Sequence, residues 1–322
     1  MQKNNALALK AFLCFTFITS LTLFCACKTP EVKVENGLVY TMHKDELSIS
    51  LETGALIENL VITSKTPELV LENFCNQPSL KSITIDLPNA KKLTFAKKSF
   101  ENCPNLQSIT INVNQSCEIL MKKKAFWACE ALRTITFNGG ETDMATKSFY
   151  CPNLENVYVN NGKLLYITPL LKYSTNVKNV TLDNGYVYFW NNYYNYQKER
   201  LNIDLTIENV NLSNGSNWYF TYRHDTPYVK NMYFADDFSF ENSEVYSLRY
   251  DGFMSFGKYY EPVAQNIYLN KNCGNIPAKF FGEKGSATLY FNGSEEEWNA
   301  LTIEEEKNNS YFFDNIKVVA LN

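Results

Sequence analysis

The sequence has few of the residues and motifs on which most enzymes depend. Only two histidines, His43 and His224, occur in 322 residues, which excludes a histidine-rich metal centre and a paired-histidine mechanism. There is no glycine-rich phosphate loop of the GxGxxG or GxxxxGK[ST] kind and no GxSxG nucleophile motif. We therefore expect that the protein is not an enzyme, with no catalytic residues, no cofactor and no metal site.

An excess of charge of one sign is also lacking. Thirty basic and 34 acidic side chains leave a formal net charge of −4, with an isoelectric point of about 5.5. Nucleic-acid-binding proteins usually have a basic face and a high isoelectric point, so we expect no nucleic-acid partner. With 13 glycines, 10 prolines and 45% hydrophobic residues, the composition is that of a folded protein with a sizeable core, not of collagen or a disordered chain.

An uncharged, mostly apolar run occupies residues 11–24. It is short for a helix that spans the ~30 Å hydrocarbon core of a bilayer, but it suits the hydrophobic part of a signal peptide. The run ends in Phe24-Cys25-Ala26-Cys27, which resembles a bacterial lipobox, where a cysteine after a small residue is lipidated and becomes the mature N-terminus. We predict a signal peptide over residues 1–26 and lipid attachment at Cys27. Ordinary cleavage near Ala26, without a lipid, is the alternative.

A repeat of about 23 to 26 residues dominates the rest of the chain. The pattern L-x-x-I-x-I occurs in residues 78–86, 104–112, 130–138 and 152–160, and each copy follows a Phe that has a Cys one to three residues later. The last two apolar residues are two apart, so they point to one face of a short strand. A single repeat cannot bury that face, whereas stacked repeats form a parallel sheet over a continuous apolar core.

The strand half of the repeat continues toward the C-terminus with less fidelity. Ten candidate strands have their first core residue at positions 60, 83, 109, 135, 157, 180, 205, 232, 267 and 289, and the seventh of them places Leu205 and Ile207 in the core. We expect a tether and N-terminal cap (27–46), regular repeats (47–160), degenerate aromatic-rich repeats (161–288), and a last repeat with a C-terminal cap (289–322).

The unit Phe-x-x-Cys-x-x-Leu-x-x-Ile-x-Ile resembles the BspA-type leucine-rich repeats of bacterial surface proteins. Residues 289–303, LYFNGSEEEWNALTI, are similar to the closing segment of those arrays. The resemblance implies a β-rich solenoid of repeats of about 22–27 residues on a parallel sheet, with irregular or short helical return segments. It also implies a role in adhesion or protein–protein contact, although a fold does not determine a function.

The closing segment has a physical interpretation of its own. Ser294 and Glu297 form a capping-box pattern, and Trp298 and Leu301 have the spacing to cover the last repeat. We read this segment as a terminal cap. A calcium site made by the glutamates at 295–297 and 304–306 is the alternative, although these acids lack the alternating spacing of a calcium loop.

Six cysteines lie in the body of the chain, at positions 75, 103, 117, 129, 151 and 273. Cys103, Cys129 and Cys151 occupy equivalent repeat positions, where a cysteine packs as a small apolar residue. We therefore predict free buried thiols. A disulfide between stacked repeats remains open.

Residues 186–196, YVYFWNNYYNY, contain seven aromatics and no charge. Alternation places Val187 and Phe189 inward and Tyr186, Tyr188 and Trp190 outward, and such a cluster is typical of protein-contact hot spots and of sugar-stacking platforms. The plainer interpretation is that these aromatics pack the loops of degenerate repeats.

These observations predict an exported lipoprotein, anchored in the outer membrane by its lipid and facing the cell surface, with a protein ligand that is extracellular or on another cell. The ligand would bind either the polar strand wall or the aromatic segment. An envelope lipoprotein that binds or processes carbohydrate through the aromatic platform is the alternative. A structural scaffold facing the periplasm is a third hypothesis.

Overall fold

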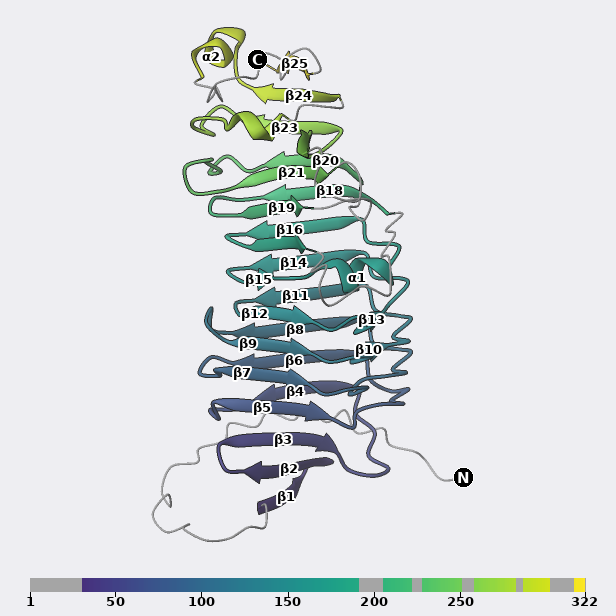
Figure 1. The fold of residues 1–322 in the computed structure, drawn as a ribbon. Coiled ribbons are helices and arrows are strands. Elements are labelled where there is room, and N and C mark those ends of the chain that lie inside the picture. The colour runs from purple at the N-terminus through teal and green to yellow at the C-terminus, as the bar shows by residue number, and fades with distance from the viewer. Residues whose placement is uncertain are drawn as a thin grey trace. The chain divides into compact units, whose positions relative to one another are not determined.

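The computed structural model describes residues 31–190, 205–221, 228–250, 258–281, 286–301 and 316–321 (Figure 1). The chain divides into two compact units, Met1–Asn153 and Leu154–Asn322. Within each unit, successive repeats contribute strands to two sheets that are almost entirely parallel. The prediction of a β-rich solenoid with repeats stacked on a parallel sheet is confirmed.

In the first unit, one sheet contains the L-x-x-I-x-I strands, which are β4 (Asn59–Thr63), β6 (Ser82–Leu87), β8 (Ser108–Val113) and β11 (Thr134–Asn138). The second sheet contains β1 (Glu31–Glu35), β2 (Leu38–His43), β3 (Glu46–Leu51), β5 (Glu68–Glu72), β7 (Lys92–Phe95), β9 (Glu118–Met121) and β12 (Glu141–Met144). A short parallel pair joins β10 (Phe126–Trp127) and β13 (Phe149–Tyr150). The first three strands form antiparallel hairpins. Strands β1 and β2 lie within the stretch predicted as tether and N-terminal cap (27–46), whereas β3 extends beyond it and also pairs in parallel with β5.

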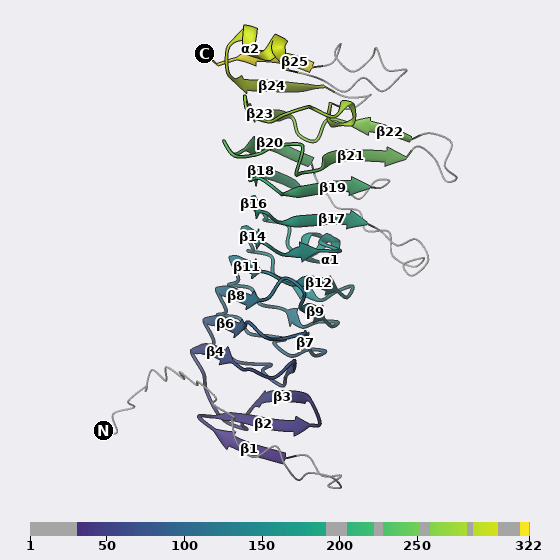
Figure 2. The ribbon, with the colours of Figure 1, turned by 90° about the vertical axis from the view of Figure 1, so that its left-hand side faces the viewer.

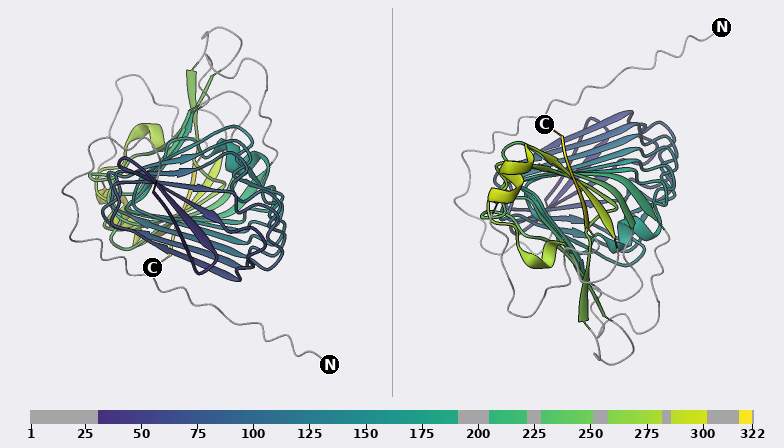
Figure 3. Two further views of the ribbon diagram at one scale, coloured as in Figure 1. Left: turned by 90° about the horizontal axis from the view of Figure 1, so that it is seen from below. Right: turned by 90° about the horizontal axis from the view of Figure 1, so that it is seen from above.

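In the second unit, the L-x-x-I-x-I sheet contains β14 (Asn156–Asn160), β16 (Asn179–Asp183), β18 (Thr206–Leu212), β20 (Tyr228–Phe234), β23 (Asn266–Asn270), β24 (Ala287–Asn292) and β25 (Ile316–Ala320). The other sheet contains β15 (Lys163–Leu164), β17 (Tyr186–Trp190), β19 (Asn217–Thr221), β21 (Val245–Tyr250) and β22 (Lys258–Glu261). Its helices are α1 (Thr168–Lys172), the 3₁₀ turn η1 (Ala278–Phe280) and α2 (Glu295–Ala300). Figures 2 and 3 show the two sheets of this unit as separate walls.

The second strand of each repeat is a feature that the sequence prediction lacked. The return segments were expected to be irregular or helical, yet most of them are strands with their own inward side chains. In β7, for example, Leu93 and Phe95 are fully buried, and they alternate with half-buried Lys92 and Thr94. These strands are mostly four or five residues long, and their sequences differ as much as KLTF and ETDM do. Only the first strand of each repeat, which has the stronger pattern, is therefore recognisable from the sequence.

The register of one strand differs from the sequence prediction. Val210 and Leu212 of β18, rather than Leu205 and Ile207, lie beside Val180 and Leu182 of β16. Strand β18 has seven residues and buries Ile207, Val210 and Leu212. Leu205 and Ile207 are nevertheless buried, as the sequence predicts, and Ile207 pairs with Val229 of β20, which like β18 has seven residues. The segment contains two apolar pairs, at 205/207 and at 210/212, and the sequence prediction assigns the first pair to the register position that the second pair occupies.

The Phe and Cys positions of the repeat form an internal column in the first unit. Rings of successive repeats stack, with centroids 4.9 Å apart for Phe74–Phe100, 5.2 Å for Phe100–Phe126 and 5.3 Å for Phe126–Phe149. Beside them, each thiol donates a hydrogen bond to the carbonyl of the Phe in an earlier repeat, as Cys103 does to Phe74 at 3.3 Å. Each aromatic pair adds about 1 kcal/mol beyond simple burial, so this column ties the repeats together.

The predicted capping box is present at α2. The Glu297 amide donates to Ser294 Oγ at 3.1 Å, and the Ser294 amide donates to a Glu297 carboxylate oxygen at 2.9 Å. Trp298 packs edge-on against Phe291 of β24 with centroids 5.3 Å apart. The structure adds strand β25, which follows the helix in sequence and pairs with β24, so the edge of this sheet lies beyond the repeat that the sequence predicts to be the last.

One turn position of the first unit requires a left-handed backbone in three successive repeats. Asn76, Asn102 and Ala128 have φ values of 59°, 60° and 61°. Asparagine tolerates this conformation, whereas for alanine it costs about 1 kcal/mol because Cβ approaches the following carbonyl oxygen. The Asn102 side-chain amide also donates to Asn76 Oδ1 at 2.8 Å, a contact that Ala128 cannot extend.

We therefore predict that Ala128→Asn raises the free energy of unfolding by about 0.5–1 kcal/mol, because it removes the backbone penalty and adds one more amide to the row. Chemical denaturation of the variant and the wild-type protein measures the change. Ala131→Asn, at a nearby half-buried position with ordinary φ, is the control and should bring no gain. A loss of stability in Ala128→Asn would contradict this reading of the turn.

Candidate binding site

Four tyrosines of the second unit form a cluster on the outer face of one sheet. We call Tyr186, Tyr188, Tyr219 and Tyr246 the tyrosine cluster. Tyr188, Tyr219 and Tyr246 are in register on the neighbouring strands β17, β19 and β21. Their rings meet edge to face, with centroids 6.1 Å apart for Tyr188–Tyr219 and 4.8 Å for Tyr219–Tyr246. The parallel register thus gathers residues that are 58 positions apart in sequence (246 − 188).

The local sequence explains why these rings point outward. Each ring alternates with an inward residue of its strand, such as Val187 beside Tyr186 and Tyr188, or Val245 beside Tyr246. Val187 and Val245 are fully buried, while Tyr186, Tyr188 and Tyr246 are half-buried. The inward valines therefore fix which way the tyrosines face. Tyr186, Tyr188 and Tyr246 present aromatic surface, whereas Tyr219 between them is buried.

Tyr219 is the centre of the cluster. Its ring also contacts Tyr186 at 5.2 Å, and its hydroxyl donates a hydrogen bond to the Glu244 carboxylate. Burial of the phenol, followed by the hydrogen bond to Glu244, raises the pKa of Tyr219 well above its ordinary value. On the side of Tyr246, the Lys279 ammonium lies 4.5 Å from the ring centroid. The cluster thus combines tyrosine ring surface, which protein hot spots favour, with one carboxylate and one cation beside it.

The structure brings together two of the three site residues that the sequence predicts. Tyr186 and Tyr188 are in the cluster, whereas the side chain of Trp190 lies outside the described residues. Sequence reasoning missed Tyr219, Tyr246 and Lys279. The two tyrosines could have been found because each lies next to an inward residue in its own aromatic-rich strand, but no sequence signal places Lys279 beside them.

A second set of tyrosines lies on the other sheet of the same unit. Tyr233, Tyr268 and Tyr290 are in register on β20, β23 and β24, and we call them the tyrosine ladder. Their rings stack nearly parallel, with centroids 4.6 Å and 4.7 Å apart and interplanar angles of 13° and 10°. Each ring face is occupied by the next ring, so the ladder offers mainly ring edges and hydroxyls. The signal in the sequence is a tyrosine between two core residues, as in MYF, IYL and LYF.

A row of asparagines runs beside the tyrosine ladder on the same sheet. The side-chain amides of Asn179, Asn209, Asn231 and Asn266 each donate to the Oδ1 of the preceding asparagine, starting from Asn156, at 2.9, 2.9, 3.2 and 3.0 Å. The amides thereby satisfy one another along the sheet. Because these amides bond to one another, fewer of their hydrogen-bonding groups are available to a ligand, and the row mainly stabilises the sheet.

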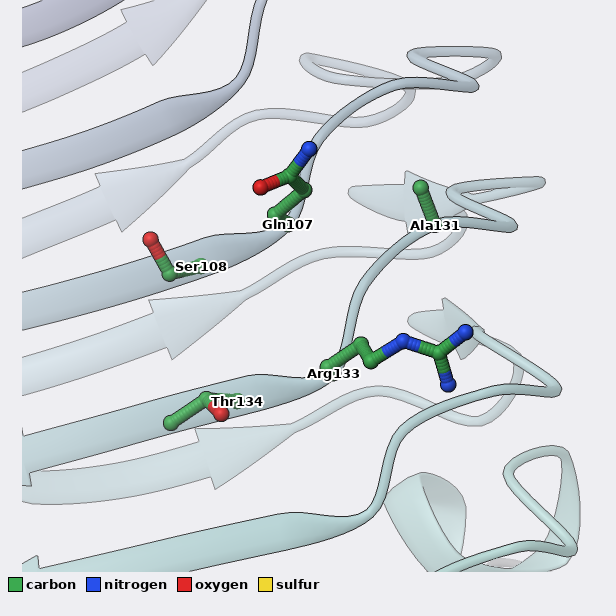
Figure 4. A pocket seen from close by; sticks show the side chains of 5 residues that line it. All are labelled: Gln107, Ser108, Ala131, Arg133 and Thr134. Carbon is green, nitrogen blue, oxygen red and sulfur yellow. The ribbon is translucent and has the colours of Figure 1, made fainter.

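The polar strand wall of the first unit, the alternative binding surface, is made of small side chains. Thr84, Thr110 and Thr136 are half-buried and in register on β6, β8 and β11. A shallow hollow of about 570 Å³ opens where β8 and β11 begin, and its lining residues are Gln107, Ser108, Ala131, Arg133 and Thr134 (Figure 4). Arg133 is exposed and donates to the Asn153 carbonyl at 3.5 Å. This hollow has no aromatic ring, so the tyrosine cluster is the stronger candidate.

The cysteines of the described chain are free, as the sequence predicts, and all but half-buried Cys75 are buried. Contact with the Cys129 thiol, together with burial, raises the pKa of Cys103 far above its ordinary value. Burial raises the pKa of Cys273 to about 11, and burial next to Glu118 does the same for Cys117. At neutral pH these thiols are protonated, so they are poor nucleophiles and poor metal ligands.

The described residues bear only in part on lipid attachment, metal binding and membrane spanning. Cys27 lies outside them. Within them, no group of three or more His, Cys, Asp or Glu side chains is placed to hold a metal ion. Over the same part of the chain, no helix has the length and apolar character to cross a bilayer.

The raised pKa of Tyr219 predicts a dependence of stability on pH. The neutral phenol is favoured in the folded state, so its contribution is fully present below about pH 10 and is lost as the pH rises from there toward the higher folded pKa. The loss is up to about 1.4 kcal/mol per pH unit. We expect Tyr219→Phe to lose less stability than the wild-type protein between pH 9 and pH 11 in denaturant titrations. Exposed Tyr228→Phe is the control, and equal losses in all three proteins would contradict the assignment.

Comparison with known proteins supports the repeat assignment. Residues 68–202 match the sequence model of the BspA type leucine rich repeat region in six copies. Among curated proteins, none matches this chain. The crystal structure of the pneumococcal vaccine antigen PcpA aligns with 92% of this chain and 100% of that chain, at 10% identity and a TM-score of 0.21, a likeness too slight to inform fold or function. Over residues 68–202, the chain is thus similar to the family that its sequence resembles.

Proposed function

We propose that this protein is a lipid-anchored cell-surface protein that binds another protein through the tyrosine cluster. The observation that carries the proposal is the cluster itself, in which rings from three strands meet around Tyr219 with Lys279 and Glu244 at its border. Tyrosines supply large contact area at low conformational cost, and fixing them on a sheet lowers that cost further. The repeats support the same conclusion, because stacked strands present extended surfaces that suit macromolecular ligands.

The N-terminal sequence and the repeat match support the proposed location. The lipobox-like segment that ends at Cys27 supports export and acylation, and the match of residues 68–202 to BspA-type repeats supports a surface location. Two or three acyl chains anchor a protein firmly, because each buried methylene contributes ~0.8 kcal/mol. We propose that the anchor holds the repeats at the outer membrane, facing outward.

The alternative function is carbohydrate binding at the same cluster. Tyrosine faces stack on sugar rings as well as on protein side chains, and Glu244 and Lys279 could bond sugar hydroxyls. The edge-to-face packing favours the protein ligand. In this packing the central ring, only 9% exposed, is covered by its neighbours, which leaves a broad, uneven surface rather than a flat platform.

The double variant Tyr186→Ala, Tyr188→Ala tests the site. We expect it to weaken binding to a protein ligand by about 2 kcal/mol or more, roughly thirtyfold, because it removes two half-buried aromatic anchors of the cluster. Binding is measured by surface plasmon resonance against a panel of extracellular-matrix proteins, with a glycan array run in parallel on the same preparations.

The matched control is Tyr233→Ala, Tyr268→Ala, which removes the same side chains from the other sheet. Protein binding that is lost only in the cluster variant supports the proposal. Glycan binding that is lost in that variant favours the carbohydrate alternative. Protein binding that both double variants retain equally would contradict the assignment of the site.

A second prediction concerns location. Cys27→Ser should move the protein from the membrane fraction to the soluble fraction, because it removes the thiol that carries the lipid, and immunoblots of fractionated cells measure this. In intact cells expressing the wild-type protein, an added protease should degrade it while a periplasmic marker is spared. Membrane retention of Cys27→Ser would refute the anchor. Protection from the protease would instead indicate a periplasmic scaffold.

A further inference from the structure

Lysines accumulate on one edge of the first unit. Three successive turns, at residues 96–102, 122–128 and 145–151, follow β7, β9 and β12 and contain Lys97, Lys98, Lys122, Lys123, Lys124 and Lys147, which we call the lysine edge. Backbone hydrogen bonds stack these turns directly on one another, from the Lys98 amide to the Lys123 carbonyl at 3.2 Å and from the Lys124 amide to the Lys147 carbonyl at 2.8 Å. The lysines therefore repeat at the ~4.8 Å spacing of neighbouring strands.

This arrangement concentrates positive charge in a protein whose net charge is −4. The three turns contain six lysines and one acidic residue, Glu101, which gives them a net charge of +5 (6 − 1). Like charges on stacked turns repel one another and cost stability. Such a cluster is favourable when it binds a polyanion, since the partner neutralises the repulsion.

Glu101 orders the centre of the lysine edge. Its two carboxylate oxygens lie 3.0 Å from Lys98 Nζ and 3.0 Å from Lys124 Nζ. Hydrogen bonds from Lys98 and then from Lys124 lower the pKa of the Glu101 carboxyl, which therefore remains ionised at neutral pH. Two cations are thus fixed on neighbouring turns, and a hydrogen-bond acceptor lies between them.

An aromatic pair adjoins these cations. Trp127 of β10 and Tyr150 of β13 are in register, and their rings stack with centroids 5.0 Å apart. The Lys124 ammonium lies 5.3 Å from the centroid of the Trp127 ring, so the charged and aromatic parts are continuous. Tyr150 is 39% exposed, which makes it one of the few exposed large aromatic or aliphatic residues among those that the structure describes in this unit. Strands β10 and β13 appear at the right-hand edge of the first unit in Figure 1.

We propose that the lysine edge, together with Trp127 and Tyr150, binds an anionic polysaccharide, meaning a sugar chain that bears carboxylate or sulfate groups. The ammonium groups would pair with the anionic substituents on successive turns. The exposed ring would stack against the apolar face of a sugar. The carboxylate oxygens of Glu101 already accept from Lys98 and Lys124, and their remaining lone pairs would accept hydrogen bonds from sugar hydroxyls. This feature favours a polysaccharide over DNA, whose backbone offers phosphates and no hydroxyl donors.

This second site lies in the first unit, on residues separate from the tyrosine cluster, and it does not depend on the proposed protein-binding function. Its ligand class is also different, because the tyrosine cluster has one lysine where the lysine edge has six. A failed test of either site leaves the other standing.

The test uses the purified full chain and immobilised heparin as a polyanionic sugar probe, with uncharged dextran and double-stranded DNA as comparisons at equal salt. We expect heparin to bind and dextran not to bind. The variant Lys98→Gln, Lys123→Gln, Lys124→Gln should bind heparin about tenfold more weakly, because each exposed ion pair contributes roughly twofold in affinity. Tyr150→Ala should weaken heparin binding without changing net charge.

The control variant Lys65→Gln, Lys81→Gln, Lys91→Gln removes the same charge from exposed positions of the same unit and should bind within about twofold of the wild-type protein. Melting temperatures of all variants verify folding. Equal weakening by both triple variants would overturn the proposal, because it would show a response to net charge alone. Binding of DNA that is tighter than that of heparin would overturn the choice of a polysaccharide.

Discussion

The hydrogen-bonded register of parallel strands is the constraint on which the rest of this protein depends. Each repeat bonds to the next so that equivalent residues lie directly beside one another, as Ile83 and Ile109 do in the first unit. A residue type that recurs in sequence therefore becomes a column in space. Columns pointing inward make the core, and columns pointing outward make a surface, so a repeat of about 25 residues determines both at once.

The same constraint gives different results on the two faces of a strand. Inside the first unit it stacks phenylalanines and aligns thiols with carbonyls, and this column leaves little freedom for substitution. Outside, it produces a row of threonines, and it also produces rows of asparagines and tyrosines whose members contact one another. Surfaces with a distinct character arise where one outward residue type recurs over only a few neighbouring repeats, as tyrosine does at the tyrosine cluster and lysine does at the lysine edge.

The sequence predicted the repeated strand well, because its apolar positions and the Phe and Cys landmarks recur at fixed spacing. It did not predict the second strand of each repeat, since segments as different as KLTF and ETDM fold alike. Tyr186 and Tyr188 were found from local alternation alone. Tyr219, Tyr246 and Lys279 were missed because their proximity arises from stacking between repeats, and single-sequence patterns contain no information about which turn lies beside which strand.

The row of buried thiols has a consequence for the order of events during biogenesis. In the unfolded chain, Cys103, Cys129 and Cys151 are ordinary thiols that form disulfides within seconds to hours in an oxidising compartment. Once each donates its hydrogen to a carbonyl in the core, it is shielded from oxidants. If the chain is exported, as proposed above, it must therefore fold before it is oxidised. Folding can outpace oxidation because contacting repeats are only about 25 residues apart in sequence, and closing loops of that length is fast compared with disulfide formation.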